Sequence, residues 1–190
     1  MKKVIYLSML GAALVQLHGC AAVAVGAVAT GASMATDRRT TGVYVSDQEI
    51  ELRAMTKLDE DFKQDTVHVS VTSYNQQLLL TGQVPDEATR NRLTKVMGGV
   101  PEVRKVFNET AVSGVASLTS EGNDAAITTQ VKSRMLQDDR VPVTKIKVVT
   151  ETSVVYLMGL VTQAEGKAAA DVASTTGGAT KVVKLFEYIN

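Results

Sequence analysis

The sequence contains one cysteine, two histidines and no tryptophan among its 190 residues. Cys20 has no second cysteine to pair with, so no disulfide forms within the chain. If Cys20 is modified and His18 is cleaved away, as argued below, His68 alone cannot build a zinc centre or a Cys–His nucleophilic pair. We therefore expect no catalytic residue, no metal and no cofactor.

An excess of charge of either sign is also missing, because 20 Lys and Arg residues balance 20 Asp and Glu residues. Proteins that bind nucleic acid usually carry a basic excess, so we expect no nucleic-acid partner. Acidic runs occur at residues 59–61 and 138–139, at the ends of predicted helices and without a histidine or nucleophile beside them. Solvated acids are ordinary at such places, and we do not expect an enzyme.

The first twenty residues have the layout of a secretory signal. Lys2 and Lys3 precede an apolar run from Val4 to Leu17, which is too short to span a bilayer of about 30 Å of hydrocarbon. The run ends in Leu-His-Gly-Cys at residues 17–20, a pattern similar to a bacterial lipobox, in which the cysteine thiol receives a diacylglycerol and becomes the new N-terminus. The alternative is an ordinary signal peptide with a buried thiol nearby. We predict lipidation at Cys20.

Residues 21–36 consist of small side chains interrupted by glycine, serine and threonine. A second membrane segment is one interpretation, but the run is short and weakly hydrophobic for a span. We favour a flexible tether. Ala21 after the cysteine is not the aspartate that retains enteric lipoproteins at the inner membrane, so the sorting rule points to the outer membrane with the body in the periplasm.

The rest of the chain repeats itself at a separation of 77 residues. Asp47 corresponds to Asp124, and both stand where the N-cap of a helix is expected. The apolar residues that follow have helical spacing in both copies. They are Ile50, Ala54 and Leu58 in the first copy and Ile127, Val131 and Met135 in the second. The chain therefore carries two copies of one module.

The sequence of each copy predicts five elements in the order helix, strand, strand, helix and strand. The expected elements are 46–62, 66–73, 77–84, 85–98 and 102–112, then 123–137, 143–150, 153–161, 163–176 and 180–189. A hairpin makes the first two strands antiparallel, whereas the helix between the second and third strands makes that pair parallel. The predicted fold class is α+β, with two tandem αββαβ modules, each a three-stranded mixed sheet with two helices on one face. The predicted boundaries are a signal peptide at 1–19, the acylated cysteine and tether at 20–45, modules at 46–113 and 123–190, and a linker at 114–122.

The second strand of each copy carries a recognisable pattern. Leu-x-Leu-x-Gly-x-Val at residues 78–84 and its counterpart at 155–161 are similar to BON domains. With the lipobox and the Ala/Val-rich tether, the chain resembles dual BON-domain outer-membrane lipoproteins. This resemblance implies a non-enzymatic protein that binds anionic phospholipid through its second module and supports envelope integrity, with enrichment at the division site.

The resemblance places the lipid-binding surface on the first helix of the second module. Family members can carry a tryptophan there, and Ala126 stands at that position, so lipid affinity is expected to be weaker or to depend on other side chains. The predicted lipid-binding residues are Gly122, Asn123, Asp124, Ala126, Ile127, Thr129, Gln130, Ser133, Arg134, Leu136 and Gln137. Leu136 lies beside the apolar stripe and fits either the core or a lipid contact.

Four cations give the second copy a cationic face in this interpretation: Lys132, Arg134, Lys145 and Lys147. Each exposed basic side chain near an anionic leaflet contributes up to about 1 kcal/mol. The alternative is an ordinary solvated surface.

The strand at residues 154–161 is apolar on both faces. Such a strand is usually covered on both sides, and the helices cover only one. We predict that Tyr156, Met158 and Leu160 pack between the two modules. The alternatives are tolerated surface apolarity and, for the whole protein, a periplasmic adaptor that binds envelope-assembly or cell-wall proteins.

Overall fold

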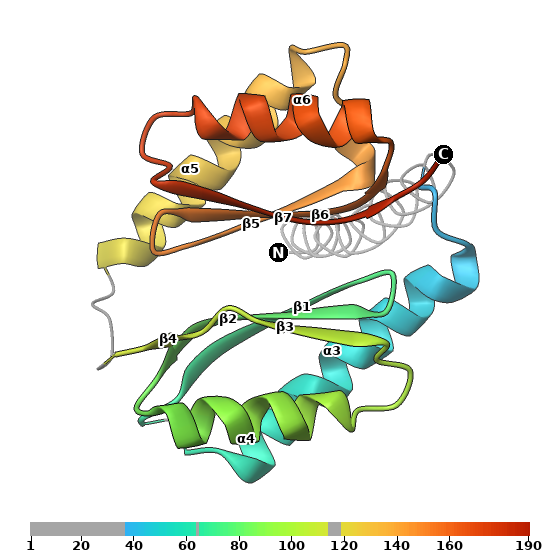
Figure 1. Cartoon of the computed structure of the whole chain (residues 1–190). Coiled ribbons are helices and arrows are strands. Elements are labelled where there is room, and N and C mark those ends of the chain that lie inside the picture. The colour runs from blue at the N-terminus through green and yellow to red at the C-terminus, as the bar shows by residue number, and fades with distance from the viewer. Residues whose placement is uncertain (1–36, 64, 114–118) are drawn as a thin grey trace, which may run out of the picture. The chain divides into compact units, whose positions relative to one another are not determined.

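The computed structural model describes residues 37–63, 65–113 and 119–190, and the side chains of residues 119–121 are left out of the description. The predicted signal peptide, Cys20, most of the tether and most of the linker lie outside these ranges. Residues 38–190 form one compact unit. Within it, the confirmed α+β class takes the form of two mixed sheets, each with its own pair of helices (Figure 1).

The first domain runs from α3 to β4. Its elements are α3 (Thr41–Asp61), β1 (His68–Tyr74), β2 (Gln77–Val84), α4 (Glu87–Gly98), β3 (Lys105–Asn108) and β4 (Ala111–Val112). β1 pairs with β2 in the antiparallel sense, while β3 and β4 both pair with β2 in parallel. α3 and α4 cover one face of this sheet (Figure 1), where Ile50, Leu80 and Met97 lie in one buried cluster.

The second domain repeats this order. Its elements are α5 (Thr119–Leu136), a 3-10 turn (Val143–Lys145), β5 (Ile146–Glu151), β6 (Val154–Val161), α6 (Gln163–Ser174) and β7 (Lys181–Tyr188). β6 is antiparallel to β5 and parallel to β7. α5 and α6 cover one face, and Ile127, Leu157 and Ala169 lie in the core beneath them. α6 begins in a capping box, in which Thr162 and Glu165 each bond the other's backbone N–H.

The first helix of each domain starts earlier than predicted. α3 begins at Thr41, inside the segment that we assigned to the tether, because the Thr40 hydroxyl accepts a hydrogen bond from Val43 N at 3.3 Å and caps the helix. α5 begins at Thr119, inside the predicted linker. Asp47 and Asp124 therefore lie within helices, and the N-cap role expected for them is wrong.

The third strand of the first domain also differs from the prediction. The stretch 102–112 folds as two short strands, β3 and β4, with Glu109 and Thr110 between them. The Asn108 side chain accepts hydrogen bonds from the backbone and hydroxyl of Thr110 and donates to the Arg90 carbonyl oxygen. These bonds hold the chain in a local bend, which interrupts the strand.

Gly82 occupies the middle of β2 with φ of +115°, which side-chain-bearing residues rarely adopt. A Cβ atom there would lie 2.0 Å from the carbonyl oxygen of His68 on β1. Gly159 takes the equivalent place in β6, where a Cβ would lie 2.7 Å from the carbonyl oxygen of Lys145. The recurring glycine therefore permits a close approach of the backbone at the start of the preceding strand.

Candidate functional site

The surface of α5 is the candidate site, and the structure divides its predicted residues into two groups. Exposed positions are Gly122, Asn123, Ala126, Thr129, Gln130, Ser133, Arg134, Leu136 and Gln137. Leu136 is 69% exposed, so it belongs to the surface and not to the core. Asp124 and Ile127 are only 7% and 2% exposed. These two residues do not contribute to the exposed face in this conformation.

Asp124 holds α5 against the β5–β6 hairpin. Its two carboxylate oxygens accept hydrogen bonds from the backbone N–H groups of Thr152, at 2.7 Å, and Ser153, at 2.8 Å. Both turn residues have positive φ, so their N–H groups point away from the ladder and need a partner. The Ile127 side chain packs against Gly178 and fills the space that a side chain at that position would need. Asp124 and Ile127 thus position the helix that carries the exposed residues.

Arg134 ties α5 to the end of α6. Its guanidinium donates to the Val172 carbonyl oxygen at 3.2 Å, to Thr176 Oγ1 at 2.8 Å and to Thr175 Oγ1 at 3.0 Å. The last carbonyl groups of a helix lack intrahelical partners and carry partial negative charge, so a guanidinium stabilises this end. Arg134 is therefore both an exposed cation and a brace between the two helices.

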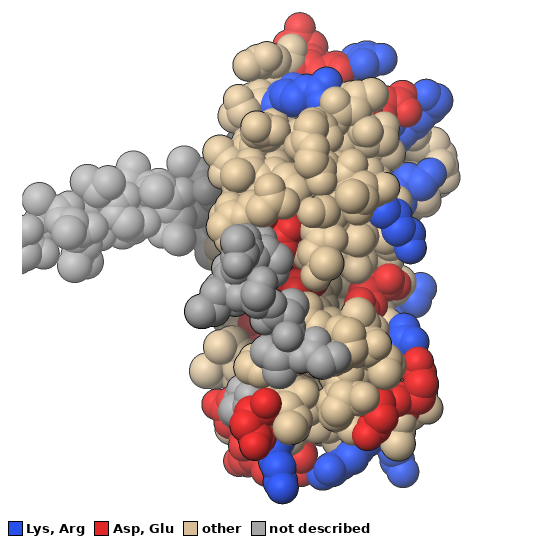
Figure 2. All heavy atoms as spheres, turned by 90° about the vertical axis from the view of Figure 1, so that its left-hand side faces the viewer, with Lys and Arg blue, Asp and Glu red and all other residues tan. Residues whose placement is uncertain are grey.

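From Gly122 onward, the exposed charges of α5 are of one sign. Between Gly122 and Gln137 the charged residues are Asp124, which is buried, and the exposed Lys132 and Arg134. The equivalent stretch of α3 exposes carboxylates: Glu49, Asp59 and Glu60 stand where α5 has Ala126, Leu136 and Gln137. Figure 2 shows one face of the molecule, on which uncharged side chains cover most of the second domain and lysines and arginines gather toward its margins. An anionic surface therefore meets no exposed carboxylate along this part of α5.

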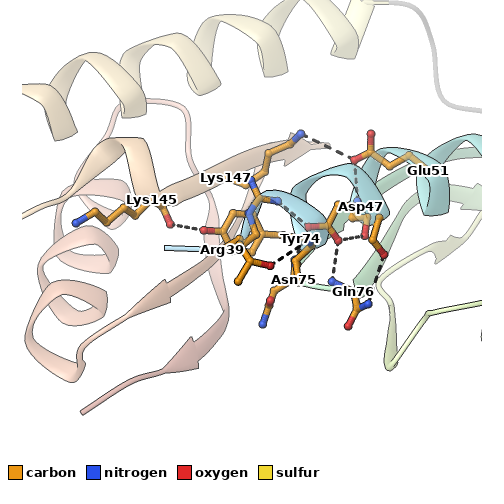
Figure 3. A network of polar contacts seen from close by, with 12 residues as sticks. Arg39, Asp47, Glu51, Tyr74, Asn75, Gln76, Lys145 and Lys147 are labelled. Carbon is orange, nitrogen blue, oxygen red and sulfur yellow. Dashed lines mark hydrogen bonds and ion pairs between the residues drawn. The ribbon is translucent and has the colours of Figure 1, made fainter. Parts of the chain in front are cut away.

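The other two predicted cations lie near the first domain. Lys147 is exposed and stands 4.0 Å from Glu51 of α3, and the Lys145 backbone carbonyl accepts a hydrogen bond from Tyr74 Oη at 3.0 Å (Figure 3). A carboxylate this close partly neutralises Lys147 toward an anionic ligand. Of the four predicted cations, Lys132 and Arg134 are therefore exposed on α5, whereas Lys147 is partly neutralised by Glu51.

A third apolar cluster contains side chains from both sheets. Its buried members are Tyr74 and Leu79 of the first domain and Tyr156, Met158 and Leu185 of the second. Leu160 is partly buried against this cluster. Burial, with Glu109 and Glu151 nearby, raises the pKa of Tyr156 to about 12. Polar contacts continue outside the cluster: Gln83 Nε2 donates to Glu151 at 3.1 Å, and Arg104 pairs with Glu187 at 2.8 Å.

Two adjacent arginines, which sequence reasoning missed, form ion pairs with different domains. Arg38 makes a two-pronged ion pair with Glu165 at 2.7 and 2.8 Å and also donates to the Leu160 carbonyl oxygen. The Arg38 guanidinium lowers the pKa of Glu165 to about 2. Arg39 pairs with Asp47 and lies over the ring of Tyr74, 4.0 Å from its centroid (Figure 3).

A polar cleft of about 680 Å³ borders the first turns of α5. Ala125, Thr128 and Thr129 line it on the side of the second domain, and His68 and Gln83 line it on the side of the first. Thr129 and Leu136 are seven residues apart and therefore share one flank of α5, so the cleft borders the N-terminal part of the flank that carries Leu136.

Comparison with known proteins decides the family. The BON domain family profile matches residues 46–114 and 123–190. The chain is 40% identical over 185 residues to the outer membrane lipoprotein DolP of Haemophilus influenzae, covering 97% of this chain and 96% of that protein. This chain belongs to the DolP family of dual BON-domain outer-membrane lipoproteins. The resemblance seen in the sequence is confirmed.

Other relatives share part of this length. The chain is 31% identical to a 21 kDa hemolysin of Actinobacillus pleuropneumoniae, over 80% of this chain and 79% of that protein. It is 28% identical to the osmotically-inducible protein Y of Escherichia coli, over 74% of this chain and 72% of that protein. None of these DolP-family and BON-domain relatives is named as an enzyme.

Two further observations concern the described residues alone. No helix among them is both long and apolar enough to cross a bilayer. The same residues contain no cluster of three or more histidine, cysteine, aspartate or glutamate side chains that could hold a metal ion.

Proposed function

We propose that this DolP-family protein binds anionic phospholipid through α5 of its second BON domain while Cys20 anchors it to the outer membrane, with the body in the periplasm. In this role it supports envelope integrity at division sites and catalyses no reaction. The observation that carries the proposal is the exposed surface of α5, which places Leu136 beside Lys132, four residues earlier, with Arg134 on the other flank and, between Gly122 and Gln137, no exposed carboxylate.

The energies suit a weak, reversible contact. Transfer of Leu136 into the headgroup boundary contributes about 2 kcal/mol, and Lys132 about 1 kcal/mol near an anionic leaflet. Ala126 supplies little apolar area where an aromatic ring would supply much more. An acylated Cys20 would make a weak contact sufficient, because tethering raises the effective concentration of the helix at the membrane.

Vesicle flotation tests this proposal with a matched pair of variants. The chain from Ala21 onward, without the lipidated cysteine, is mixed with phosphatidylglycerol–phosphatidylethanolamine vesicles or with phosphatidylcholine vesicles. Leu136→Asp should abolish binding to the anionic vesicles, because it introduces the acidic residue found at Asp59 of the first domain. Leu52→Asp is the control, since Leu52 is exposed to 67% on the equivalent helix. It should bind like the parent chain.

Two more measurements sharpen the test. Ala126→Trp should strengthen binding, because the ring adds apolar area at headgroup level. Raising the salt concentration to about 0.5 M should weaken binding through screening. Equal binding of the parent chain to anionic and zwitterionic vesicles, or equal losses in Leu136→Asp and Leu52→Asp, would contradict the proposal.

The adaptor function is the second candidate. The apolar strand Val154–Val161 has Tyr156 and Met158 buried in the shared cluster and does not offer them to a partner. A partner therefore needs another surface, and the first domain offers one.

A further inference from the structure

α3 and α4 of the first domain border an open groove of about 930 Å³, which we call the α3–α4 groove. Its apolar lining comes from Leu52, Val96, Val100 and Pro101. Leu52 is 67% exposed, so it stands at the groove without a covering side chain. Exposed apolar side chains beside a concave surface are typical of protein-interaction sites.

The two domains differ at this place although they are copies. Arg134 of the second domain reaches from α5 to the end of α6 and occupies the space between the helices with hydrogen bonds to Val172 O, Thr175 and Thr176. The equivalent residue of the first domain is Lys57. It pairs at 3.0 Å with Glu60 on its own helix. The brace that joins the helices in the second domain is therefore replaced by an intrahelical pair, and a groove lies between α3 and α4.

The lining of the groove carries more cations than carboxylates, although one of the cations, Arg53, also pairs at 2.9 Å with Glu49 on its own helix. Arg53, Lys57, Arg92 and Lys95 line the groove, against Glu60 and Asp61. Arg92 stands 3.8 Å from Asp61 and lies over the Phe62 ring, while Lys95 has no ion-pair partner within the described ranges. An apolar floor with a cationic rim is complementary to an apolar stripe with acidic flanks.

The backbone of the walls restricts the occupant further. Both walls are helices, whose interior N–H and C=O groups bond within the helix, so an extended peptide would find no strand edge with which to pair. A helix satisfies its own backbone and packs between two others through side chains alone. We infer that the α3–α4 groove binds an amphipathic helix of a protein partner, with an apolar stripe on Leu52 and acidic residues facing Arg53, Arg92 and Lys95.

This inference does not depend on lipid binding, and a selection experiment tests it. The full-length chain in dodecylmaltoside micelles is presented to a displayed library of helical peptides with randomised surface positions. The selected peptides should carry apolar residues at i, i+3, i+4 and i+7 with Asp or Glu beside them. Leu52→Asp and Lys95→Glu should each weaken their binding roughly tenfold or more, as expected for central interface residues.

Leu136→Asp is the matched control and should leave peptide binding unchanged, whereas it should abolish vesicle binding. Lys95→Glu keeps the test decisive if Leu52→Asp alters the fold, because Lys95 is an exposed side chain. Four outcomes would overturn the inference. The first is that no peptide is enriched, and the second is that the enriched peptides have basic flanks. The third is self-association that Leu52→Asp abolishes, which indicates that a second copy of this chain occupies the groove. The fourth is loss of vesicle binding in Leu52→Asp, which indicates that the groove contacts a membrane.

Discussion

Arg39 and Asp47 form a nearly buried ion pair at 2.7 Å, with side chains exposed to 9% and 0%. The Asp47 carboxylate also accepts hydrogen bonds from the Ser73 hydroxyl and from the backbone N–H groups of Asn75 and Gln76 (Figure 3). Asp47 thus fixes the β1–β2 turn, as Asp124 fixes the β5–β6 turn. Among the described residues, an arginine pairs with Asp47, whereas none pairs with Asp124.

Removal of Arg39 should destabilise the protein strongly. Arg39→Met keeps an apolar stem over Tyr74 but leaves the Asp47 charge buried, which costs about 3 kcal/mol of unfolding free energy. Arg53→Met is the control, because Arg53 pairs with Glu49 on an exposed helix surface and should cost less than about 0.5 kcal/mol. Urea unfolding followed by circular dichroism measures both. Equal losses of unfolding free energy in the two variants would show that burial of the Arg39–Asp47 pair adds nothing to stability.

The contact between Arg38 and Glu165 should depend on pH. The folded-state pKa of Glu165 is about 2, below the usual value of about 4.3 in an unfolded chain. Its stabilising contribution is therefore complete above about pH 5 and is lost as the pH falls through the folded pKa. The difference in unfolding free energy between the parent chain and Arg38→Gln should shrink between about pH 5 and pH 2. A difference that stays constant over this range would disprove the assignment.

Gly82→Ala should be among the most damaging small substitutions. The new methyl group would lie 2.0 Å from the His68 carbonyl oxygen, and φ of +115° is strained for alanine. We expect a loss of about 3 kcal/mol or more. Gly98→Ala is the control, since the last residue of α4 has nothing within 4 Å of an added Cβ. It should be neutral or stabilising by up to about 1 kcal/mol. Thermal unfolding of both variants compares them directly.

The shared apolar cluster can be monitored through Tyr156. Leu79 of β2 is 1% exposed and lies in this cluster, on the opposite side of the strand from the core residues Leu78 and Leu80. Leu79→Asn should therefore open the cluster and let water reach Tyr156 without adding a charge, and the pKa of Tyr156 should fall from about 12 toward about 10. Carbon-13 resonances of the tyrosine rings, assigned with Tyr156→Phe, report this value. A pKa that stays near 12 would mean that Tyr156 is buried by its own domain alone.

Much of the fold follows from local patterns. β2 and β6 occupy Gln77–Val84 and Val154–Val161, within the stretches 77–84 and 153–161 for which the hairpin turn and the repeat predicted strands. The starts of α3 and α5 were missed because glycine and small polar residues are weak helix formers, and hydrogen bonds such as that between Thr40 and Val43 decide whether the helix continues.

The candidate site was less accessible to sequence reasoning. A helical wheel orders residues around an axis but does not show what covers each flank, so Asp124 and Ile127 were grouped with the surface residues around them. The repeat itself contained a usable signal, because the equivalent residues Asp47 and Ile50 are buried as well. The contact of Arg38 with Glu165 joins residues 127 positions apart, and no periodicity reports such a pair.

Arg38 and Arg39 are consecutive residues that form ion pairs with different domains. Arg38 pairs with Glu165 of the second domain, and Arg39 pairs with Asp47 of the first. A pull transmitted along the backbone from the N-terminal side therefore meets the ion pair of Arg38 with the second domain first and the ion pair of Arg39 with the first domain next. Both ion pairs have to break before α3 is drawn away. Loss of either arginine would leave a single domain to resist the pull at this point.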